Sequence, residues 1–208
     1  MHHHSRHRRN FIKTGLCLGC GLLLPPTASA ANIRELNGVV FINKHQATVD
    51  STIRAGDLVT TSHGSSIAFS VNGDAFLLKE RTSLRVGAER CSLIDTLRLL
   101  TGKLLSVFET GRERRIITAN ATIGIRGTAC FLNTSPRSLY YCNCYGHTQL
   151  TMKGFHKGFS ATHHNAHQID FDGEKYMGMA ATEVKDHTDD ELRRLEAMLG
   201  RIPPFDKP

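Results

Sequence analysis

The sequence predicts a mainly β fold: a compact β-sandwich or β-roll of short strands with one C-terminal amphipathic helix. Between residues 33 and 159, short β-branched and aromatic runs alternate with turn residues at intervals of roughly eight to twelve residues, as they do in all-β domains. Helical spacing of apolar residues appears only near the C-terminus. The 208 residues suffice for one ordinary domain with appendages.

The first predicted strands form successive hairpins. The strongest turn is Asn72-Gly73, because this dipeptide suits a two-residue hairpin turn. It joins alternating runs at 67–71 and 75–78, so Phe69 and Val71 should share one face of the sheet. The other strands are predicted at 39–42, 47–49, 58–61, 97–100, 104–108, 116–123 and 139–147.

One helix is predicted at the C-terminus. Thr188 and Glu191 have the spacing of a capping box, which starts a helix, and Gly200 and Pro203-Pro204 end it. The apolar side of this helix must be buried, so we expect it to pack on the β domain rather than on a partner. That side consists of Leu192, Leu195, Met198 and Leu199.

Residues 1–30 have the anatomy of a signal peptide, with a basic start, an apolar run at 14–24 and small residues before Ala31. The apolar run is shorter than the about 20 residues that span a bilayer, so we expect no stable membrane span in the mature protein. The segment Arg8-Arg9-Asn10-Phe11-Ile12-Lys13 resembles the twin-arginine translocation (Tat) signal. This resemblance implies export of the folded chain by the Tat translocase and residence in the periplasm after cleavage near Ala30.

The positive charge of the chain is concentrated in this leader. Four basic residues lie within the first thirteen positions and no acid comes before Glu35, so removing these four reduces the formal charge from +7 to +3. A charge this small does not indicate binding to the phosphate backbone of a nucleic acid. The four residues are Arg6, Arg8, Arg9 and Lys13.

Several motifs between residues 37 and 132 resemble the FecR domain family. They include Gly56-Asp57, the Thr61 to Ser66 segment, Asn72-Gly73-Asp74 and Thr101-Gly102-Lys103-Leu104, and the most specific one is Ile123-Gly124-Ile125-Arg126-Gly127-Thr128. The resemblance implies a compact β structure outside the inner membrane. In the iron-citrate signalling proteins that name the family, this domain takes part in transmitting a signal to a sigma factor.

Those relatives carry a cytoplasmic segment and a membrane helix, whereas the apolar run of this chain belongs to its leader. We therefore expect a periplasmic sensor or binding module for an envelope protein or a small ligand, without direct anti-sigma activity. No catalytic motif is recognisable, so we do not expect an enzyme. The predicted parts are the leader (1–30), the FecR-like β domain (33–132), a Cys/His-rich β extension (133–185), and the C-terminal helix with its Pro-rich tail (186–208).

Structural roles are predicted for the segment Arg126-Gly127-Thr128 and for the cysteines. Arg126 is interpreted as capping a tight bend at Gly127 and Thr128 through hydrogen bonds to backbone carbonyls. The mature chain has four cysteines in an oxidising compartment, so disulfides are the default expectation and three pairings are possible. Whether Cys130 bonds Cys91 or joins the remaining two cysteines is left open by the sequence.

The remaining two cysteines, Cys142 and Cys144, lie in a predicted strand, whose period of two places both on one face. They cannot easily bond each other, but they can chelate one soft ion such as zinc, copper or iron. A turn at Gly146 would bring His147 close, and a helix over 161–168 would place two further histidines on one face. The alternative function is therefore a Tat-exported metal-binding or redox protein with candidate ligands Cys142, Cys144, His147, His163, His164 and His167.

Overall fold

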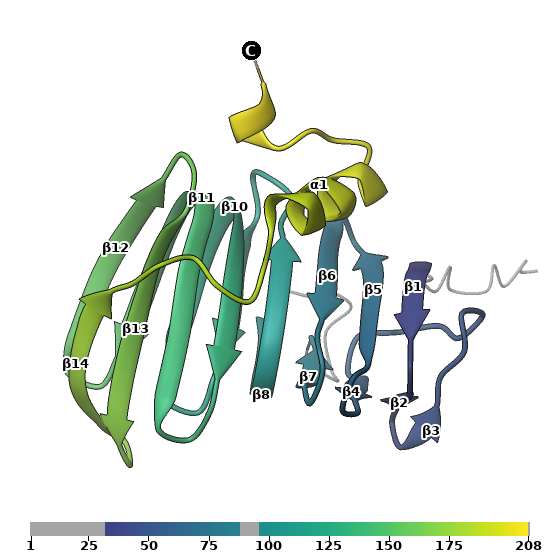
Figure 1. Cartoon of the computed structure of the whole chain (residues 1–208), viewed down its shortest axis with the longest axis horizontal. Helices are drawn as coiled ribbons and strands as arrows, with labels where there is room; N and C mark the ends of the chain where they lie inside the picture. Colours follow the sequence, from purple (N-terminus) through teal and green to yellow (C-terminus); the bar gives the residue numbers. More distant parts are fainter. Residues whose placement is uncertain (1–31, 88–95, 208) are drawn as a thin grey trace, which may run out of the picture.

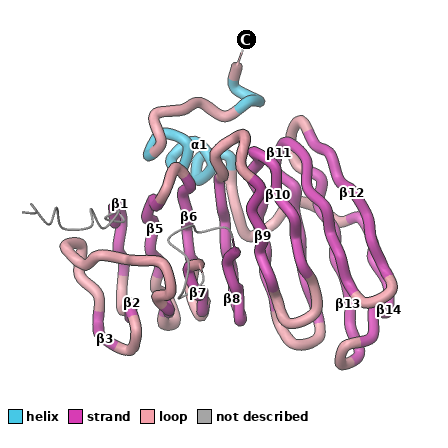
Figure 2. The backbone as a smooth tube through the Cα atoms, turned by 180° about the vertical axis from the view of Figure 1, so that it is seen from behind, coloured by secondary structure: helices cyan, strands magenta, loops and turns pink. Residues whose placement is uncertain are grey.

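The computed structural model describes residues 32–87 and 96–207, and within them the protein is mainly β with one C-terminal α-helix, as predicted. The predicted leader and Cys91 lie outside the described residues. The strands belong to one continuous sheet that folds over on itself into two layers (Figures 1 and 2). A large apolar core fills the space between these layers.

The first layer contains the first and the last strand of the sequence, β1 and β14, and it carries the candidate site on its outer face. Three long strands lie at its centre, between β6 and β13, and are shared with the second layer. All strand pairs in this layer are antiparallel. Its other strands are β1 (Asn32–Asn37), β5 (Ser66–Val71), β6 (Asp74–Leu78), β13 (Asn165–Asp172) and β14 (Lys175–Ala181).

The second layer lies behind the first in Figure 1 and faces the viewer in Figure 2. It is antiparallel except for the pairing of β8 with β9. Its own strands are β2 (Val40–Ile42), β3 (His45–Gln46), β4 (Leu58–Thr61), β7 (Ser83–Val86), β9 (Glu113–Ile117) and β12 (Phe155–Ala161).

The shared strands β8 (Thr96–Val107), β10 (Thr122–Thr134) and β11 (Ser138–Met152) cross from one layer to the other. Each contains a glycine with positive φ near the point where its partners change: Gly102, Gly127 and Gly146. Packing also requires glycine at these corners, since a Cβ at Gly146 would lie 2.8 Å from the side chain of Thr128.

The C-terminal segment covers the outer face of the first layer. Figure 1 shows the chain after β14 crossing β13, β11 and β10 to reach α1 (Asp189–Met198), which packs on β6 and β8. The predicted capping box of Thr188 and Glu191 is confirmed, and Leu192 and Leu195 are buried. A short 3-10 helix, η1 (Pro204–Asp206), follows. Neither helix in the described part of the chain has the length and apolar character needed to cross a membrane.

The hairpin at Asn72-Gly73 is also confirmed. Both residues have positive φ, 51° and 81°, as a type I′ turn requires, and they join β5 to β6. Phe69 and Val71 are buried in the core between the layers and so share one face. The hydrophobic pattern was therefore sufficient to place this part of the sheet.

Other predicted elements have different limits in the structure. The runs at 97–100 and 104–108 belong mostly to one strand, β8, because Gly102 bends the chain without ending the ladder. The stretch 116–123 is divided between β9 and β10 by a loop closed by a hydrogen bond from the Thr118 amide to the Ala121 carbonyl. Residues 47–49 lie after β3 and are not a strand.

Arg126 does not cap the bend of β10 as expected. It pairs across the ladder with Glu113, so its guanidinium points to solvent, 80% exposed and 3.5 Å from that carboxylate. The bend depends instead on Gly127, where a Cβ would lie 2.8 Å from Thr110, and on Thr128, whose buried hydroxyl donates to the Asn143 side-chain oxygen. The predicted structural role holds for these two residues but not for the arginine.

Candidate metal centre

Two thiols and two imidazoles converge beneath the C-terminal segment. One ligand atom from each of Cys142, Cys144, His164 and His187 lies within 4.8 Å of the other three. The thiols come from β11, His164 from the turn between β12 and β13, and His187 from the chain between β14 and α1. Three segments distant in sequence therefore supply one compact group of N and S donors.

The thiols lie on the outer face of the first layer, as the period of two predicts. Cys142 and Cys144 belong to the apolar cluster under α1, whereas Cys130 belongs to the core between the layers. On a regular strand their Cα atoms would be about 6.6 Å apart. The ladder shifts register between Ala129 and Cys130, which leaves Cys144 without a Cα partner there. This bulge on β11 places two consecutive residues, Cys144 and Tyr145, on the outer face that Cys142 also occupies.

His164 is fixed by the turn in which it lies. Its φ of 50° is left-handed, and its backbone amide donates to the Cys144 carbonyl at 2.8 Å. Nδ1 of the ring lies 3.5 Å from the Cys142 sulfur, and Nε2 lies 2.8 Å from the Asp189 carboxylate. The turn therefore attaches the ring to the thiols on one side and to the first residue of α1 on the other.

His187 precedes the N-cap of α1 and is buried. Its ring is stacked on Phe131, with 4.6 Å between the ring centroids and 10° between the planes. Nε2 lies 3.4 Å from the Cys144 sulfur, and Nδ1 lies 2.9 Å from the Lys185 carbonyl oxygen. Stacking and this hydrogen bond together fix the orientation of the ring.

The partners of the two rings determine their tautomers. A carbonyl oxygen and an ionised carboxylate only accept, so Nδ1 of His187 and Nε2 of His164 carry protons. In the neutral rings, the nitrogens that face the thiols then have free lone pairs. Histidines that bind metals characteristically donate their other N–H to a carboxylate or a backbone carbonyl. Both imidazoles thus have the supporting contacts of metal ligands.

The electrostatics of the two thiols differ sharply. Hydrogen bonds, above all with Cys144 and also with His164 and His187, lower the pKa of Cys142 to about 3. Burial raises the pKa of Cys144 well above its usual range. The contact with Cys142 raises the pKa of His164. In the metal-free protein, one thiolate next to a protonated imidazole is therefore favoured.

The donor set suits a closed tetrahedral centre. Two sulfur and two nitrogen ligands form a common structural zinc site, with Zn–S near 2.3 Å and Zn–N near 2.0–2.1 Å. These bond lengths require roughly 3.3–3.8 Å between neighbouring donors. The two nitrogen–sulfur distances, 3.5 and 3.4 Å, lie in that range.

The chain of contacts from Cys142 through His164 to Asp189 also has the order of a thiol nucleophile, a base and an orienting carboxylate. However, Cys142 has no exposed surface. A substrate carbonyl could not approach its sulfur without displacing the C-terminal segment. Both thiols and His187 are buried, as the ligands of a structural metal site are, so the geometry favours metal binding over nucleophilic catalysis.

Two of the six predicted ligands point away from this centre. Gly146 does turn the chain, but it is the corner of β11 and directs His147 into the second layer, where Nδ1 contacts the Ser160 hydroxyl at 2.7 Å. His167 pairs with Tyr141 and packs on Phe159 in the inner core, the opposite face from the thiols. The predictions of these two histidines as ligands are wrong in this fold.

His163 lies next to the centre but does not face the thiols. Its Nε2 is 3.0 and 3.1 Å from the two oxygens of Asp189, and its ring is stacked on Phe205. The possible helix over 161–168 is absent, because β12 ends at Ala161 and β13 begins at Asn165. His163 and His167 therefore do not share a helix face.

The described cysteines form no disulfide with one another. Cys130 faces the inner core beside the Ser106 hydroxyl, so the sheet separates it from Cys142 and Cys144. Burial raises the pKa of Cys130 to about 12. A bond from Cys130 to Cys91 stays a prediction, because Cys91 lies outside the described residues.

Sequence reasoning missed His187 and Asp189. Neither has a local pattern that relates it to the thiols, and His187 is 43 residues from Cys144. The capping box gave one indirect signal: a helix that packs on the β domain brings the residue before its N-cap against the same face. His187 occupies that position.

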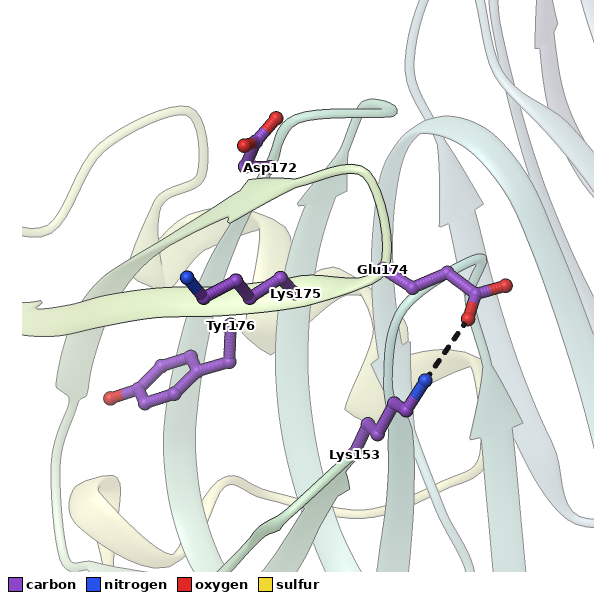
Figure 3. Close-up of a pocket in the computed structure, with 5 residues that line it drawn as sticks. All are labelled: Lys153, Asp172, Glu174, Lys175 and Tyr176. Atoms are coloured by element: carbon purple, nitrogen blue, oxygen red, sulfur yellow. Dashed lines mark ion pairs between the residues drawn. The ribbon is translucent and has the colours of Figure 1, made fainter.

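One surface hollow away from this centre lies at a turn between two strands. The hollow in Figure 3 lies at the β13–β14 turn and is lined by Lys153, Asp172, Glu174, Lys175 and Tyr176. Its ion pair, Lys153 with Glu174 at 3.6 Å, is about four-fifths exposed on both sides. Exposed pairs of this kind contribute little energy. We therefore assign no ligand to this hollow.

Comparison with known proteins identifies the fold alone. No protein-family profile and no curated protein sequence matches the chain. Two crystal structures of a candidate anti-sigma factor from Parabacteroides distasonis ATCC 8503, at 1.65 and 2.50 Å resolution, have a similar fold, each with a TM-score of 0.50 and 11% sequence identity. The match covers 60% of this chain and 58% of that one, so it spans less than two thirds of either.

Proposed function

We propose that this protein is a binding module whose β-sandwich holds one zinc ion through Cys142, Cys144, His164 and His187. One observation carries the proposal: both imidazoles direct a nitrogen toward the buried thiols while the other nitrogen donates to a carboxylate or a carbonyl. Metal binding explains why each of these imidazoles has two thiol sulfurs within 4.8 Å of its ligand nitrogen. In metal centres, a histidine characteristically binds the ion through one ring nitrogen and donates a hydrogen bond from the other.

Zinc is the metal that this donor set favours. Two thiolates and two imidazoles in tetrahedral positions match structural zinc, whereas calcium and magnesium require oxygen donors. Copper(I) and iron also bind thiolates, so they are competitors that metal analysis must distinguish. With four protein donors the ion would be closed to substrate, and its effect would be to stabilise and position the segments that bind it.

We further propose that the module acts in the periplasm. The segment that resembles a twin-arginine signal supports this, because the Tat route exports folded proteins and so allows a metal to be bound before export. The motifs that resemble the FecR family support a sensing or partner-binding role for the β-sandwich, with an envelope protein or a small ligand as the partner. On this proposal, the zinc ion fixes the C-terminal segment on a domain that binds without catalysis.

Metal analysis of the mature protein, purified without chelators, tests the zinc site. We expect about one zinc per chain by plasma mass spectrometry, falling below about one fifth in Cys142→Ser and in His187→Ala. The matched control is His147→Ala, which removes a histidine hydrogen-bonded in the other layer and should keep the metal. Absence of metal from a folded unaltered protein, or equal loss in the control, contradicts the proposal.

A further inference from the structure

The ligands of the proposed zinc site are buried to different degrees, and this gradient defines a route to solvent. Cys142 and Cys144 have no exposed surface, and His187 is 6% exposed. The side chains of His164, Asp189 and His163 are 12%, 32% and 45% exposed, in that order. Among the described groups of the site, accessibility therefore increases in one direction, from the thiols through His164 to His163.

A second group of donors lies at the outer end of this route. The ligand atoms of His163, His164 and Asp189 lie within 4.8 Å of one another. The Asp189 carboxylate contacts Nε2 of both rings, at 3.0 Å for His163 and 2.8 Å for His164. Two imidazoles and a carboxylate form a donor set that binds zinc and related divalent ions.

The two groups share one residue. His164 directs Nδ1 toward Cys142 and Nε2 toward Asp189, so its ring forms the boundary between the outer and inner donors. His163 is also held at this position, because its ring is stacked on Phe205 with 4.4 Å between centroids. The stacking and the hydrogen bonds to Asp189 fix the position of this half-exposed ring.

We propose that His163, Asp189 and the outer nitrogen of His164 form an entry site, which captures a divalent ion from solvent and passes it to the buried thiols. This inference rests on the proposed zinc site. In the transfer, the ion gives up His163 and the Asp189 oxygens and gains two sulfurs and His187. It keeps its charge throughout, so no oxidant or reductant takes part.

The protons balance in the same step. Each sulfur binds as a thiolate, and any proton that it carries is released to solvent. On capture, the Nε2 protons of His163 and His164, which face Asp189 in the metal-free protein, are released, and His164 carries its proton at Nδ1. On transfer, His164 gives up the Nδ1 proton to solvent and regains one at Nε2, which donates to Asp189 again, and His163 likewise regains its Nε2 proton from solvent. The entry site therefore changes the rates at which the inner site binds and releases the metal ion, but it does not change the affinity of the inner site for that ion.

The test follows Co²⁺ entry into the metal-free mature protein by stopped-flow absorption of the sulfur-to-cobalt charge-transfer band. In His163→Gln, the amide can still donate to Asp189 but is a poor ligand. We expect at least tenfold slower loading and release slowed by the same factor, so that the ratio of the two rates changes less than about twofold. His147→Gln, an exposed histidine of the second layer, is the control and should load at the unaltered rate.

The other outcomes separate the two proposals. Loading of His163→Gln at the unaltered rate overturns the entry site and leaves the zinc site intact. Slower loading with unchanged release means that His163 contributes to affinity, which also overturns a purely kinetic role. Equal slowing in His147→Gln attributes the effect to surface charge rather than to this route. Failure of the unaltered protein to show a sulfur-to-cobalt band overturns the zinc site itself, and the entry site with it.

Discussion

The unequal protonation of the two thiols should set the pH dependence of metal binding at the proposed centre. Burial raises the pKa of Cys144, so this thiol holds its proton at pH 7 in the metal-free protein, whereas the lowered pKa of Cys142 leaves that sulfur ionised. A metal can bind Cys144 only after the proton leaves, and falling pH therefore opposes binding.

We expect release of at least one proton per ion at pH 7, and apparent affinity that rises about tenfold per pH unit for each proton released. Isothermal titration calorimetry in buffers of different ionisation enthalpy measures this number. Cys144→Ser removes the thiol proton and should reduce the proton count together with the affinity. Binding without proton release would contradict the assigned protonation of Cys144.

The corner glycine of β11 gives a second test at single residues. Gly146 and Gly154 have similar positive φ values, 83° and 75°, but a Cβ at Gly146 would collide with Thr128 while Gly154 has open space. Gly154→Ala should cost about 1–2 kcal/mol from backbone conformation alone. Gly146→Ala should cost more, because the clash is added. Equal losses in free energy of unfolding, measured with urea, would show that the corner tolerates a side chain.

Among the elements, the C-terminal segment is the part that should depend most on the proposed metal. It is held by Leu192 and Leu195, by the buried hydrogen bond of Tyr145 with Glu196, and through His187 by the proposed ion. The chain between β14 and α1 has no strand pairing of its own, so loss of the ion should loosen it first.

Limited proteolysis measures this loosening. We expect trypsin to cleave after Lys185, which is exposed in this chain segment, at least tenfold faster in chelator-treated protein than in the zinc form. Cleavage after Arg112, in the exposed turn between β8 and β9, is the internal control and should keep its rate. Equal acceleration at both sites would indicate general unfolding instead of local release.

The elements also show which predictions the sequence could support. Alternation predicted β5, β6 and the shared face of Cys142 and Cys144, because a period of two is local. It could not predict that β11 changes layers at Gly146, so that the turn there carries His147 away from the thiols instead of toward them. It could not predict the face of His167 either, because that face depends on the pairing of His167 with Tyr141. His187 depends on where a distant helix docks, and only tertiary packing decides that.

In the molecule as a whole, the proposed metal centre lies outside the main core. The core between the layers contains side chains from both layers and none of the four proposed ligands. The buried ion pair of Asp74 with Arg114, at 2.7 Å, adds a connection between β6 and β9 that does not involve the centre. The sheet should therefore remain folded without metal, and the ion should stabilise only the C-terminal segment that packs on its outer face.

X-ray absorption spectroscopy at the zinc edge of the purified protein identifies the atoms that are bound to the ion. We expect two sulfur neighbours at about 2.3 Å and two nitrogen neighbours at about 2.0–2.1 Å, with one sulfur lost in Cys144→Ser. A spectrum with nitrogen and oxygen neighbours only would contradict the assignment of the thiols as ligands.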